Sequence, residues 1–298
     1  MPSSEALAAL ELAPEDQLWD GLAFPVMDKD EMPLQHTAGG DLVHFHRGVW
    51  WKQLNRFFCM PCSLFEAVDP QESWPDPRHA LAGYMHLCAK GAESNATYPA
   101  IVNDEVKGYS VKRLASKRKS GMIRGAANKL TVRPLAPQEL IRDGYEVYVS
   151  WHRRVAWGRD RTPESFAEWV RRACSTPKQM LLGACVDARL VAFMLPYATG
   201  HVVAPSFLAS HTEYLGYRPN DVLYHAMLCI ARQTPGITMA DFGPVCSKTS
   251  LNEFKLRFGR LREFPAYARV HPLLRLFAAE RMRVRYPWLV VKGAQKTS

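Results

Sequence analysis

The sequence lacks any long hydrophobic run. No apolar segment in its 298 residues approaches the roughly 20 residues that a membrane-spanning helix needs. The N-terminus also lacks the basic and then apolar pattern of a secretory signal. With 47% hydrophobic residues the chain can still build a core, which excludes a disordered protein. We therefore expect a cytoplasmic, globular protein with one large or two small domains.

The sequence also has no cysteine framework. Seven cysteines are an odd number, and their scatter along the chain fits a reducing compartment better than a disulfide scaffold. Cys59 and Cys62 form the one close pair, and a zinc site needs a second pair of ligands. Neither Cys88 nor the nearby His79 and His86 supplies that pair at a suitable spacing. We therefore expect buried thiols and no metal.

Acidic residues are missing from one long stretch of a chain whose formal charge is +9. Between Lys107 and Lys129 there are eight basic residues and no acidic one. A second basic cluster, Arg275 to Lys292, contains only Glu280 as an acidic residue. Each cluster fits either a solvated helix face or a surface that attracts a polyanion such as coenzyme A or tRNA. No motif typical of nucleic-acid binding accompanies either cluster.

What the sequence does contain is a regular alternation of strand and helix signals after residue 130. Two prolines, Pro137 and Pro163, are placed to begin helices, and Pro219 begins a third that Pro235-Gly236 ends. Tight turns at 187–189 and 199–200 indicate an antiparallel meander. This order predicts an α/β (α+β) fold with a mixed, largely antiparallel sheet flanked by helices. The expected strands are 130–135, 180–186, 190–197, 201–210, 237–244 and 261–270.

A lysine lies in the middle of an apolar stripe near the end of this alternation. Helical spacing places Lys255 on one face with Leu251, Phe254 and Phe258. A cation among aromatic side chains loses hydration, so it needs a partner or binds an anion or a carbonyl. Alternatively, its long stem only covers apolar surface while the ammonium reaches solvent. The spacing alone leaves both readings open.

The same region resembles a known family. The run Ala240-Asp241-Phe242-Gly243, followed by Leu251-x-x-Phe254-Lys255-x-x-Phe258-Gly259, is similar to the C-terminal half of GNAT-fold acyltransferases. It is most similar to the FemABX-like branch, whose members often carry a terminal L-x-x-F-K-x-x-F/W-G signature. The resemblance covers residues 130–270 and implies a GNAT-like acyltransferase domain there. We expect a flexible arm at 1–40, a divergent half-GNAT-like region with a basic connecting helix at 41–129, and a basic tail at 271–298.

The resemblance implies an N-acyltransferase that moves an acyl group from an acyl-CoA-type thioester to the amine of a small molecule or peptide. The usual donor loop of the family reads [QR]-x-x-G-x-[GA], and the segment 214–221 departs from it. One glycine, Gly216, remains, Pro219 removes an amide donor, and Asp221 repels phosphate. Two alternatives therefore stay open: an aminoacyl-tRNA-dependent aminoacyltransferase of the FemABX-like type, and a non-catalytic binding module with a GNAT fold.

The candidate site residues follow from the resemblance and from their positions. For the hydrophobic core, the sequence predicts that five residues are buried against the sheet: Leu223, Met227, Ile230, Phe254 and Phe258. The ligand cleft is expected beside the strand at 201–210. Asp241 is assigned to substrate binding, with a structural ion pair to Lys255 as the alternative reading. The predicted residues are Lys255, His211 and Tyr214 for catalysis, Ser206, Tyr217, Arg218 and Asn220 for the donor, and Asp241 and Asn252 for the substrate.

Overall fold

The computed structural model describes residues 19, 21–54, 58–111, 129–155, 160–271 and 290–291. The chain divides into two compact units. Unit 1 contains Met1–Val26 and Asn103–Ala240, and unit 2 contains Met27–Val102 and Asp241–Ser298. Most of the expected N-terminal arm, of the basic connecting helix and of the basic tail lies outside the described residues. In the described part of the chain no helix is long and apolar enough to cross a membrane.

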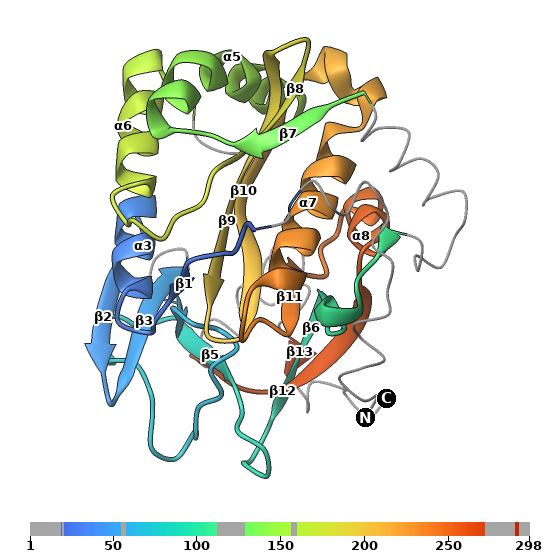
Figure 1. The fold of residues 1–298 in the computed structure, drawn as a ribbon. Coiled ribbons are helices and arrows are strands. Elements are labelled where there is room, and N and C mark those ends of the chain that lie inside the picture. The colour runs from blue at the N-terminus through green and yellow to red at the C-terminus, as the bar shows by residue number, and fades with distance from the viewer. Residues whose placement is uncertain are drawn as a thin grey trace. The chain divides into compact units, whose positions relative to one another are not determined.

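Unit 1 contains the predicted alternation of strands and helices (Figure 1). Its strands run antiparallel in the order β7-β8-β9-β10, and β11 then pairs with β10 in parallel. The strands are β7 (Thr131–Pro134), β8 (Leu182–Val186), β9 (Arg189–Thr199), β10 (Val202–Ser210) and the first part of β11 (Met239–Pro244). The helices are η1 (Val106–Gly108), α5 (Pro137–Val155), α6 (Pro163–Ala173), η3 (Thr212–Tyr217) and α7 (Pro219–Gln233).

Local signals in the sequence explain where these elements begin and end. The Thr162 side chain accepts a hydrogen bond from the Ser165 amide at 3.3 Å, which caps α6 ahead of its first residue, Pro163. Asp187 and Ala188 both have positive φ, at 45° and 67°, as the tight turn between β8 and β9 requires. The predicted α/β fold with a largely antiparallel sheet is confirmed.

The core of unit 1 forms where α5 and α6 pack on the sheet. Phe166 of α6 and Phe193 of β9 are fully buried in one cluster with Leu140 and Trp151 of α5. Gly144 permits this packing, because a Cβ at that position would lie 2.5 Å from a Leu140 methyl group. Burial of each such large side chain contributes about 1.5–3 kcal/mol to folding. The prediction that Leu223, Met227 and Ile230 of α7 are buried is also confirmed.

Strands β10 and β11 pair over only a short distance within the described residues. Their paired positions are Val202 with Met239 and Val203 with Ala240. Further along β10, the register with β9 shifts between Pro205 and Phe207. A bulge of this kind locally bends and twists a strand. Beyond its first two residues, β11 continues as part of unit 2.

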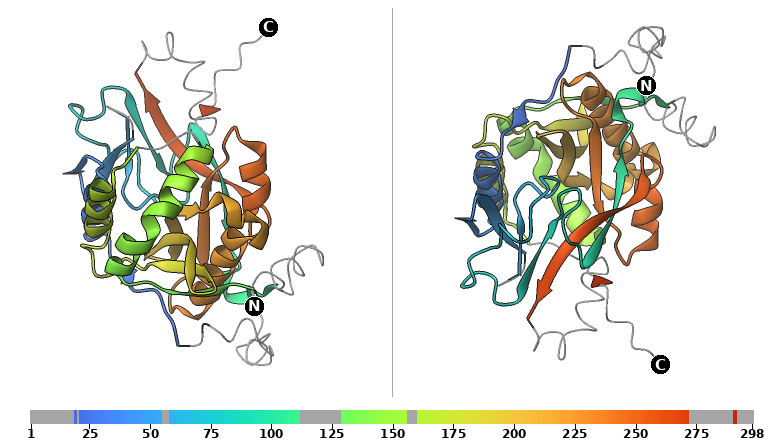
Figure 2. Two further views of the ribbon diagram at one scale, coloured as in Figure 1. Left: turned by 90° about the horizontal axis from the view of Figure 1, so that it is seen from above. Right: turned by 90° about the horizontal axis from the view of Figure 1, so that it is seen from below.

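Unit 2 contains a second set of strands, of which β12 pairs with both β5 and β6 (Figure 2). The first three strands form an antiparallel meander, and the third then pairs with β5 in parallel. The elements are α3 (Met32–Gly39), β2 (Val43–His46), β3 (Val49–Leu54), β4 (Phe58–Pro61), β5 (Gly83–Leu87), β6 (Ala96–Asn103), β11, α8 (Thr249–Lys255), β12 (Arg260–Val270) and β13 (Val290–Val291), with β1 (Val26–Met27) at the boundary.

The predicted apolar stripe around Lys255 is only partly correct. Phe258 is buried as predicted, but Phe254 is half-buried and Leu251 is exposed. Leu251 and Phe254 lie inside the short helix α8, which ends at Lys255, and Phe258 is buried from the turns that follow it. Gly259 then brings the chain against the start of β12. A Cβ at this glycine would lie 2.6 Å from the Val102 carbonyl oxygen, which explains the glycine at the end of the motif.

Candidate active site

His211 and Tyr214 lie together after β10 in unit 1. Their rings meet edge to face, with centroids 5.6 Å apart. The His211 side chain is 12% exposed, and its Nε2 lies 3.9 Å from Glu146 Oε1. Its Nδ1 is buried and has no hydrogen-bond partner among the described residues. The structure therefore leaves one nitrogen of a predicted catalytic histidine buried and without a hydrogen-bond partner among the described residues.

The hydroxyl of Tyr214 belongs to a small charged network. Arg189 donates to Tyr214 Oη at 3.1 Å and to Glu146 Oε1 at 2.8 Å. The Arg189 guanidinium also stands over the Tyr214 ring, 5.5 Å from its centroid. Because Tyr214 Oη accepts this bond, its own proton stays available for donation. An acid role for Tyr214 is chemically possible in this geometry.

The N-terminus of α7 is poorly suited to a phosphate. Arg218 precedes the helix in the left-handed region at φ 59°, and Pro219 supplies no amide donor. The Arg218 guanidinium lies 4.0 Å from the buried Asp221 carboxylate in the first helical turn. A carboxylate at this position competes with any anion for the helix terminus. Gly216 has an ordinary φ and open space around its Cβ position, so neither backbone conformation nor packing among the described residues requires a glycine there.

The other donor-binding candidates of unit 1 have different surroundings. Ser206 lies on β10 at the bulge and donates from Oγ to the Leu195 carbonyl at 2.8 Å. Asn220 lies in the first turn of α7, and its Oδ1 is buried without a partner among the described residues. Tyr217 is exposed, with its ring 6.0 Å from that of Tyr214. Asn220 is thus the one of these three with an unused buried polar atom.

Lys255 of unit 2 is buried, with 8% of its surface exposed. Its ammonium donates to the Pro244 carbonyl at 3.1 Å, and this is the one hydrogen bond it makes among the described residues. Burial lowers the pKa of Lys255, against the opposing effects of Cys246 and Asp241. Gly243, with φ 85°, leaves room for the lysine: its Cβ position lies 3.5 Å from Nζ. Two N–H groups of this buried ammonium therefore have no hydrogen-bond partner among the described residues.

Asp241 lies on β11 within electrostatic range of this lysine. Its Oδ1 accepts a hydrogen bond from the Gly243 amide at 2.8 Å. Burial raises the pKa of Asp241 to about 6, while the Gly243 amide, Lys255 and Lys52 oppose the rise. Among the described residues Asp241 forms no ion pair with either lysine, and the ammonium of Lys255 bonds to the Pro244 carbonyl. The Asp241 carboxylate thus interacts electrostatically with two lysines and forms an ion pair with neither of them among the described residues.

Asn252, predicted to bind substrate, has both amide atoms in use. Its Oδ1 accepts from the Cys246 amide at 3.0 Å, and its Nδ2 donates to the Cys246 carbonyl at 2.6 Å. The Cys246 thiol also contacts Asn252 Oδ1 at 3.3 Å. This pair of bonds fixes the loop that leads into α8. In this geometry Asn252 holds the loop, and contact with a substrate would require it to give up one of these bonds.

Sequence reasoning missed three polar residues of unit 2. Lys52 on β3 donates to His36 Nε2 at 3.2 Å, and His36 Nδ1 lies 3.0 Å from Asp41 Oδ2. Lys52 is also within electrostatic range of Asp241. The signal available in the sequence is weak: Lys52 is a charged residue inside the aromatic run of residues 49–58.

The described residues contain no group of three or more histidine, cysteine or carboxylate side chains that fits a metal ion. Burial raises the pKa of the Cys59 and Cys62 thiols to about 12. Protonated thiols are poor metal ligands and poor nucleophiles. The close cysteine pair is therefore two neutral, buried thiols.

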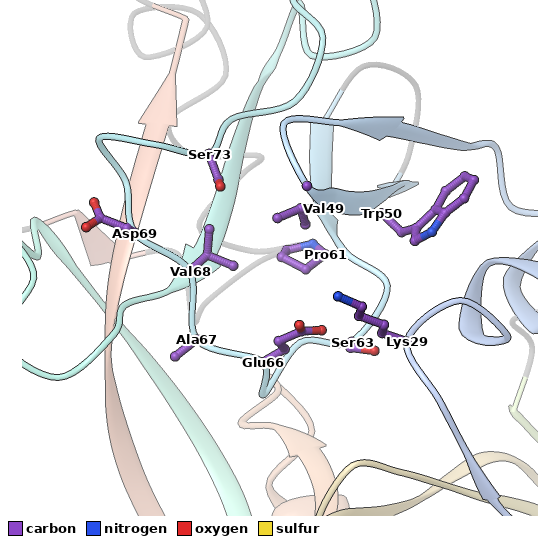
Figure 3. Close-up of a pocket in the computed structure, with 11 residues that line it drawn as sticks. Lys29, Val49, Trp50, Pro61, Ser63, Glu66, Ala67, Val68, Asp69 and Ser73 are labelled. Carbon is purple, nitrogen blue, oxygen red and sulfur yellow. The ribbon is translucent and has the colours of Figure 1, made fainter.

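A separate pocket of about 140 Å³ opens in unit 2 between the β2–β4 meander and the loop after it (Figure 3). The side chains of Lys29, Ser63 and Glu66 lie around it, together with Trp50 and Pro61. None of the predicted site residues lines this pocket. It is small and open, and its charged residues are at the surface.

Comparison with known proteins identifies the architecture. Residues 112–256 match the acetyltransferase (GNAT) domain family. The fold is GNAT-like. Over the whole chain, it is similar to the C-terminal domain of a protein described as a lysylphosphatidylglycerol synthetase from Agrobacterium fabrum. The two share 12% identity at a TM-score of 0.57, covering 95% of this chain and 98% of that one.

FemX is similar as well, with 12% identity and a TM-score of 0.53 over 88% of this chain and 97% of FemX. L-PGS from Bacillus licheniformis gives 13% identity and a TM-score of 0.52, covering 95% of this chain and 97% of that one. These comparisons confirm, at the level of the fold, the predicted resemblance to GNAT-fold proteins of the FemABX-like type. A search of curated proteins with the sequence finds no significant match. The domain match supports an acyltransferase in general and specifies neither donor nor acceptor.

Proposed function

We propose that this protein is an N-acyltransferase that moves an activated acyl group to an amine, with Lys255 and Asp241 at its chemical centre. The match of residues 112–256 to the GNAT acetyltransferase domain supports the reaction class. The observation that carries the proposal is the state of Lys255: a buried ammonium bonded to one carbonyl oxygen, with a carboxylate in range and no ion pair to it. Such a cation is costly to keep in a fold unless it serves a ligand.

The proposed roles follow from charge development in acyl transfer. When an amine attacks the acyl carbon, the carbonyl oxygen becomes negative, and the free N–H groups of Lys255 stabilise that charge. Asp241 is ionised at pH 7 because its pKa is about 6, so it accepts the proton that the attacking nitrogen loses. The new C–N bond forms as the C–S or C–O bond to the donor breaks. The leaving group then takes up a proton.

The donor is the finer part of the proposal. An acyl-CoA thioester, the donor used by GNAT acetyltransferases, is the first candidate because of the domain match. Its pyrophosphate would bind at the amide groups before α7, where Arg218 is the proposed phosphate contact and the side-chain N–H groups of Asn220 are the proposed further donors. In this proposal Asp241 is the base, and the catalytic roles of His211 and Tyr214 in unit 1 stay predictions from their position after β10. Each of these assignments is a prediction from position and chemistry.

One observation favours a second donor, an aminoacyl-tRNA ester. The α7 terminus has Pro219 at its first position and a buried Asp221 in its first turn, so it repels a pyrophosphate placed in the usual manner. A tRNA ester needs no pyrophosphate site there. FemX shares the fold over 88% of this chain, and FemABX-like proteins use aminoacyl-tRNA. The basic clusters at 107–129 and 275–292 would suit tRNA, although most of their residues lie outside the described part of the chain.

The test is a transfer assay with both donor classes. Purified protein is incubated with radiolabelled acetyl-CoA or with radiolabelled aminoacyl-tRNA, each with a panel of primary amines. Amide product is then separated from donor hydrolysis. Product from one donor class identifies the donor, and binding of that donor is checked by thermal shift. Absence of product and of any thermal shift with either donor contradicts the enzyme reading and supports a non-catalytic binding module.

A further inference from the structure

Three polar side chains of unit 2 form a chain of hydrogen bonds that the proposed acyl-transfer steps do not use. His36 lies on α3, Asp41 follows that helix, and Lys52 lies on β3. Asp41 Oδ2 is 3.0 Å from His36 Nδ1, and His36 Nε2 is 3.2 Å from Lys52 Nζ. An amine, an imidazole and a carboxylate that orients the imidazole thus follow one another within hydrogen-bond distance. This is the order of groups that activates a nucleophile in many enzymes.

The hydrogen bonds of His36 allow it to take a proton from Lys52. A carboxylate accepts hydrogen bonds only, so His36 Nδ1 carries a proton and donates it to Asp41. Nε2 is then the nitrogen that faces the lysine. The same Nε2 lies 3.1 Å from the Cys62 carbonyl oxygen, which accepts from Nε2 once that nitrogen is protonated. A proton that moves from Lys52 to His36 therefore has an acceptor in place.

The surroundings of both groups favour a neutral amine beside a neutral imidazole. Burial lowers the pKa of Lys52, and the effects that oppose it come from three other segments: Asp41, Cys62 and Asp241. Burial and the charge of Lys52 also lower the pKa of His36, so its imidazole is neutral at pH 7 and can act as a base. Lys52 is half-buried rather than fully enclosed, and the Asp41 side chain is 41% exposed. One end of the cluster is thus open to solvent.

A comparison with another partly buried lysine separates a structural role from this one. Lys107 in unit 1 donates to the carbonyls of Arg232 and Thr234, at 2.9 and 2.6 Å, where α7 ends. Those bonds satisfy carbonyl groups that a helix end leaves open, which is a sufficient reason for the lysine. Lys52 makes no bond to a backbone carbonyl among the described residues. Its one hydrogen-bond partner there is the His36 imidazole, which is a base.

We propose that Lys52 is a self-acylation site, at which the amine is activated by His36 and takes an acyl group from an activated thioester. One proton of the Lys52 ammonium goes to His36 before the attack. The amine nitrogen then attacks the thioester carbonyl carbon, the C–N bond forms and the C–S bond breaks. A second proton goes from this nitrogen to the departing thiolate. The product is an amide, so the acyl group stays on Lys52 as a modification.

The test measures the acetylation rate of individual lysines in the folded protein. The full chain is incubated at pH 7 with S-phenyl thioacetate, and acetylated peptides are quantified over time by mass spectrometry. Lys52 should be acetylated faster than the exposed Lys29 and the structural Lys107 by about tenfold or more, because only Lys52 has a base in contact with its amine. Lys52→Arg should lose the acetylated peptide. A Lys52 rate no greater than that of Lys29 overturns the proposal.

Variants of the two supporting residues test whether the cluster causes the reactivity. His36→Phe removes the base and should lower the Lys52 rate to about that of Lys29. Asp41→Asn keeps the size of a partly exposed side chain, so it keeps the test decisive if His36→Phe does not fold, and it should lower the rate by a smaller factor. His152→Phe removes a half-buried histidine of α5 in unit 1 and is the matched control, with an unchanged rate. A Lys52 rate that His36→Phe and Asp41→Asn leave unchanged also overturns the proposal.

The outcome is separable from that of the proposed function. The donor class is the same, but no step of self-acylation uses Lys255 or Asp241. A protein that acetylates Lys52 and transfers no acyl group to any added amine would retire the proposed function while self-acylation stands. Transfer to added amines with no preference for Lys52 would retire self-acylation and leave the proposed function in place.

Discussion

The charged groups around His211 in unit 1 and those around Lys255 in unit 2 are satisfied in different ways. In unit 1, Arg189 bonds to Glu146 and to Tyr214, at the surface of the loop after β10. In unit 2, Lys255 and Asp241 are largely enclosed, and each makes one hydrogen bond to the backbone. Exposed ion pairs contribute about 0–1 kcal/mol each, whereas enclosed charges without full pairing cost stability. From this difference we propose chemistry at Lys255 and Asp241 in unit 2, and we expect the unit 1 network to hold the loop after β10.

The largest effect on turnover is expected when the proposed base, Asp241, is removed. Asp241→Asn keeps the size of the side chain and can still accept from the Gly243 amide, so the fold should persist. Turnover should fall by about a hundredfold or more, as when a general base is removed. Steady-state kinetics on both proteins measures this. Asp143→Asn, which removes an exposed partner of Arg142 in unit 1, is the control and should leave turnover unchanged.

A second prediction concerns the packing around Gly259, the last residue of the Leu251–Gly259 motif in unit 2. Gly259→Ala places a methyl group 2.6 Å from the Val102 carbonyl oxygen, so the backbone must shift. The free energy of unfolding should fall by about 2–3 kcal/mol. Gly39→Ala, where the added methyl group meets no atom within 4 Å, should be neutral or slightly stabilising. Equal urea midpoints for the two variants would contradict the close packing of the motif glycine.

A third prediction tests the enclosed state of Asp241 through the pH dependence of stability. Its pKa is about 6 in the folded protein against an ordinary 3.8, so the folded state holds the extra proton between these values. The contribution of Asp241 to stability is therefore lost as the pH rises through this window. The unfolding free energy of the wild type should be compared with that of Asp241→Asn at each pH. The difference, wild type minus variant, should fall by on the order of 2 kcal/mol between pH 4 and pH 7. A difference that grows with pH would mean that Asp241 is stabilised as a carboxylate by a structural ion pair.

The smallest expected effect is in unit 1. Gly216→Ala should leave stability unchanged, because Gly216 has an ordinary φ and nothing within 4 Å of its Cβ position. In a loop that cradles a pyrophosphate closely, the same substitution would block the approach of the ligand. Isothermal titration with an acyl-CoA ester decides between the two. A lower affinity of Gly216→Ala for the acyl-CoA ester, with unchanged stability, would support a donor site in this loop.

The fold of unit 1 could be predicted because its signals are local. Pro137, Pro163 and Pro219 each begin the helix expected of them, and the turn at Asp187-Ala188 joins the expected strands. The end of α8 at Lys255 could not be read in the same way. Helical spacing continued on paper to Phe258, but Gly259 draws the chain into β12 and the helix stops early. A close contact with Val102, far away in sequence, decides this.

The candidate site could be predicted only where one segment carries it. Lys255 and Asp241 are close in sequence, and both were found from the pattern and the family resemblance. His36, Asp41 and Lys52 come from a helix, a loop and a strand, and no spacing links Lys52 to the other two. Their hydrogen bonds depend on the packing of α3 against β3, which periodicity does not predict. Tertiary contacts between distant segments are what sequence patterns leave out.

The proposed function requires that the ammonium of Lys255 is kept for chemistry rather than for the fold. Melting temperature and turnover of Lys255→Met, measured on the same preparation, test it most directly. The variant should melt at or above the wild-type temperature, because methionine fills the site without a buried charge. Its turnover should be lower by about a hundredfold or more, as when an oxyanion donor is lost. Lys248→Met, at the exposed residue before α8, should change neither quantity. Retained turnover in Lys255→Met would contradict the claim.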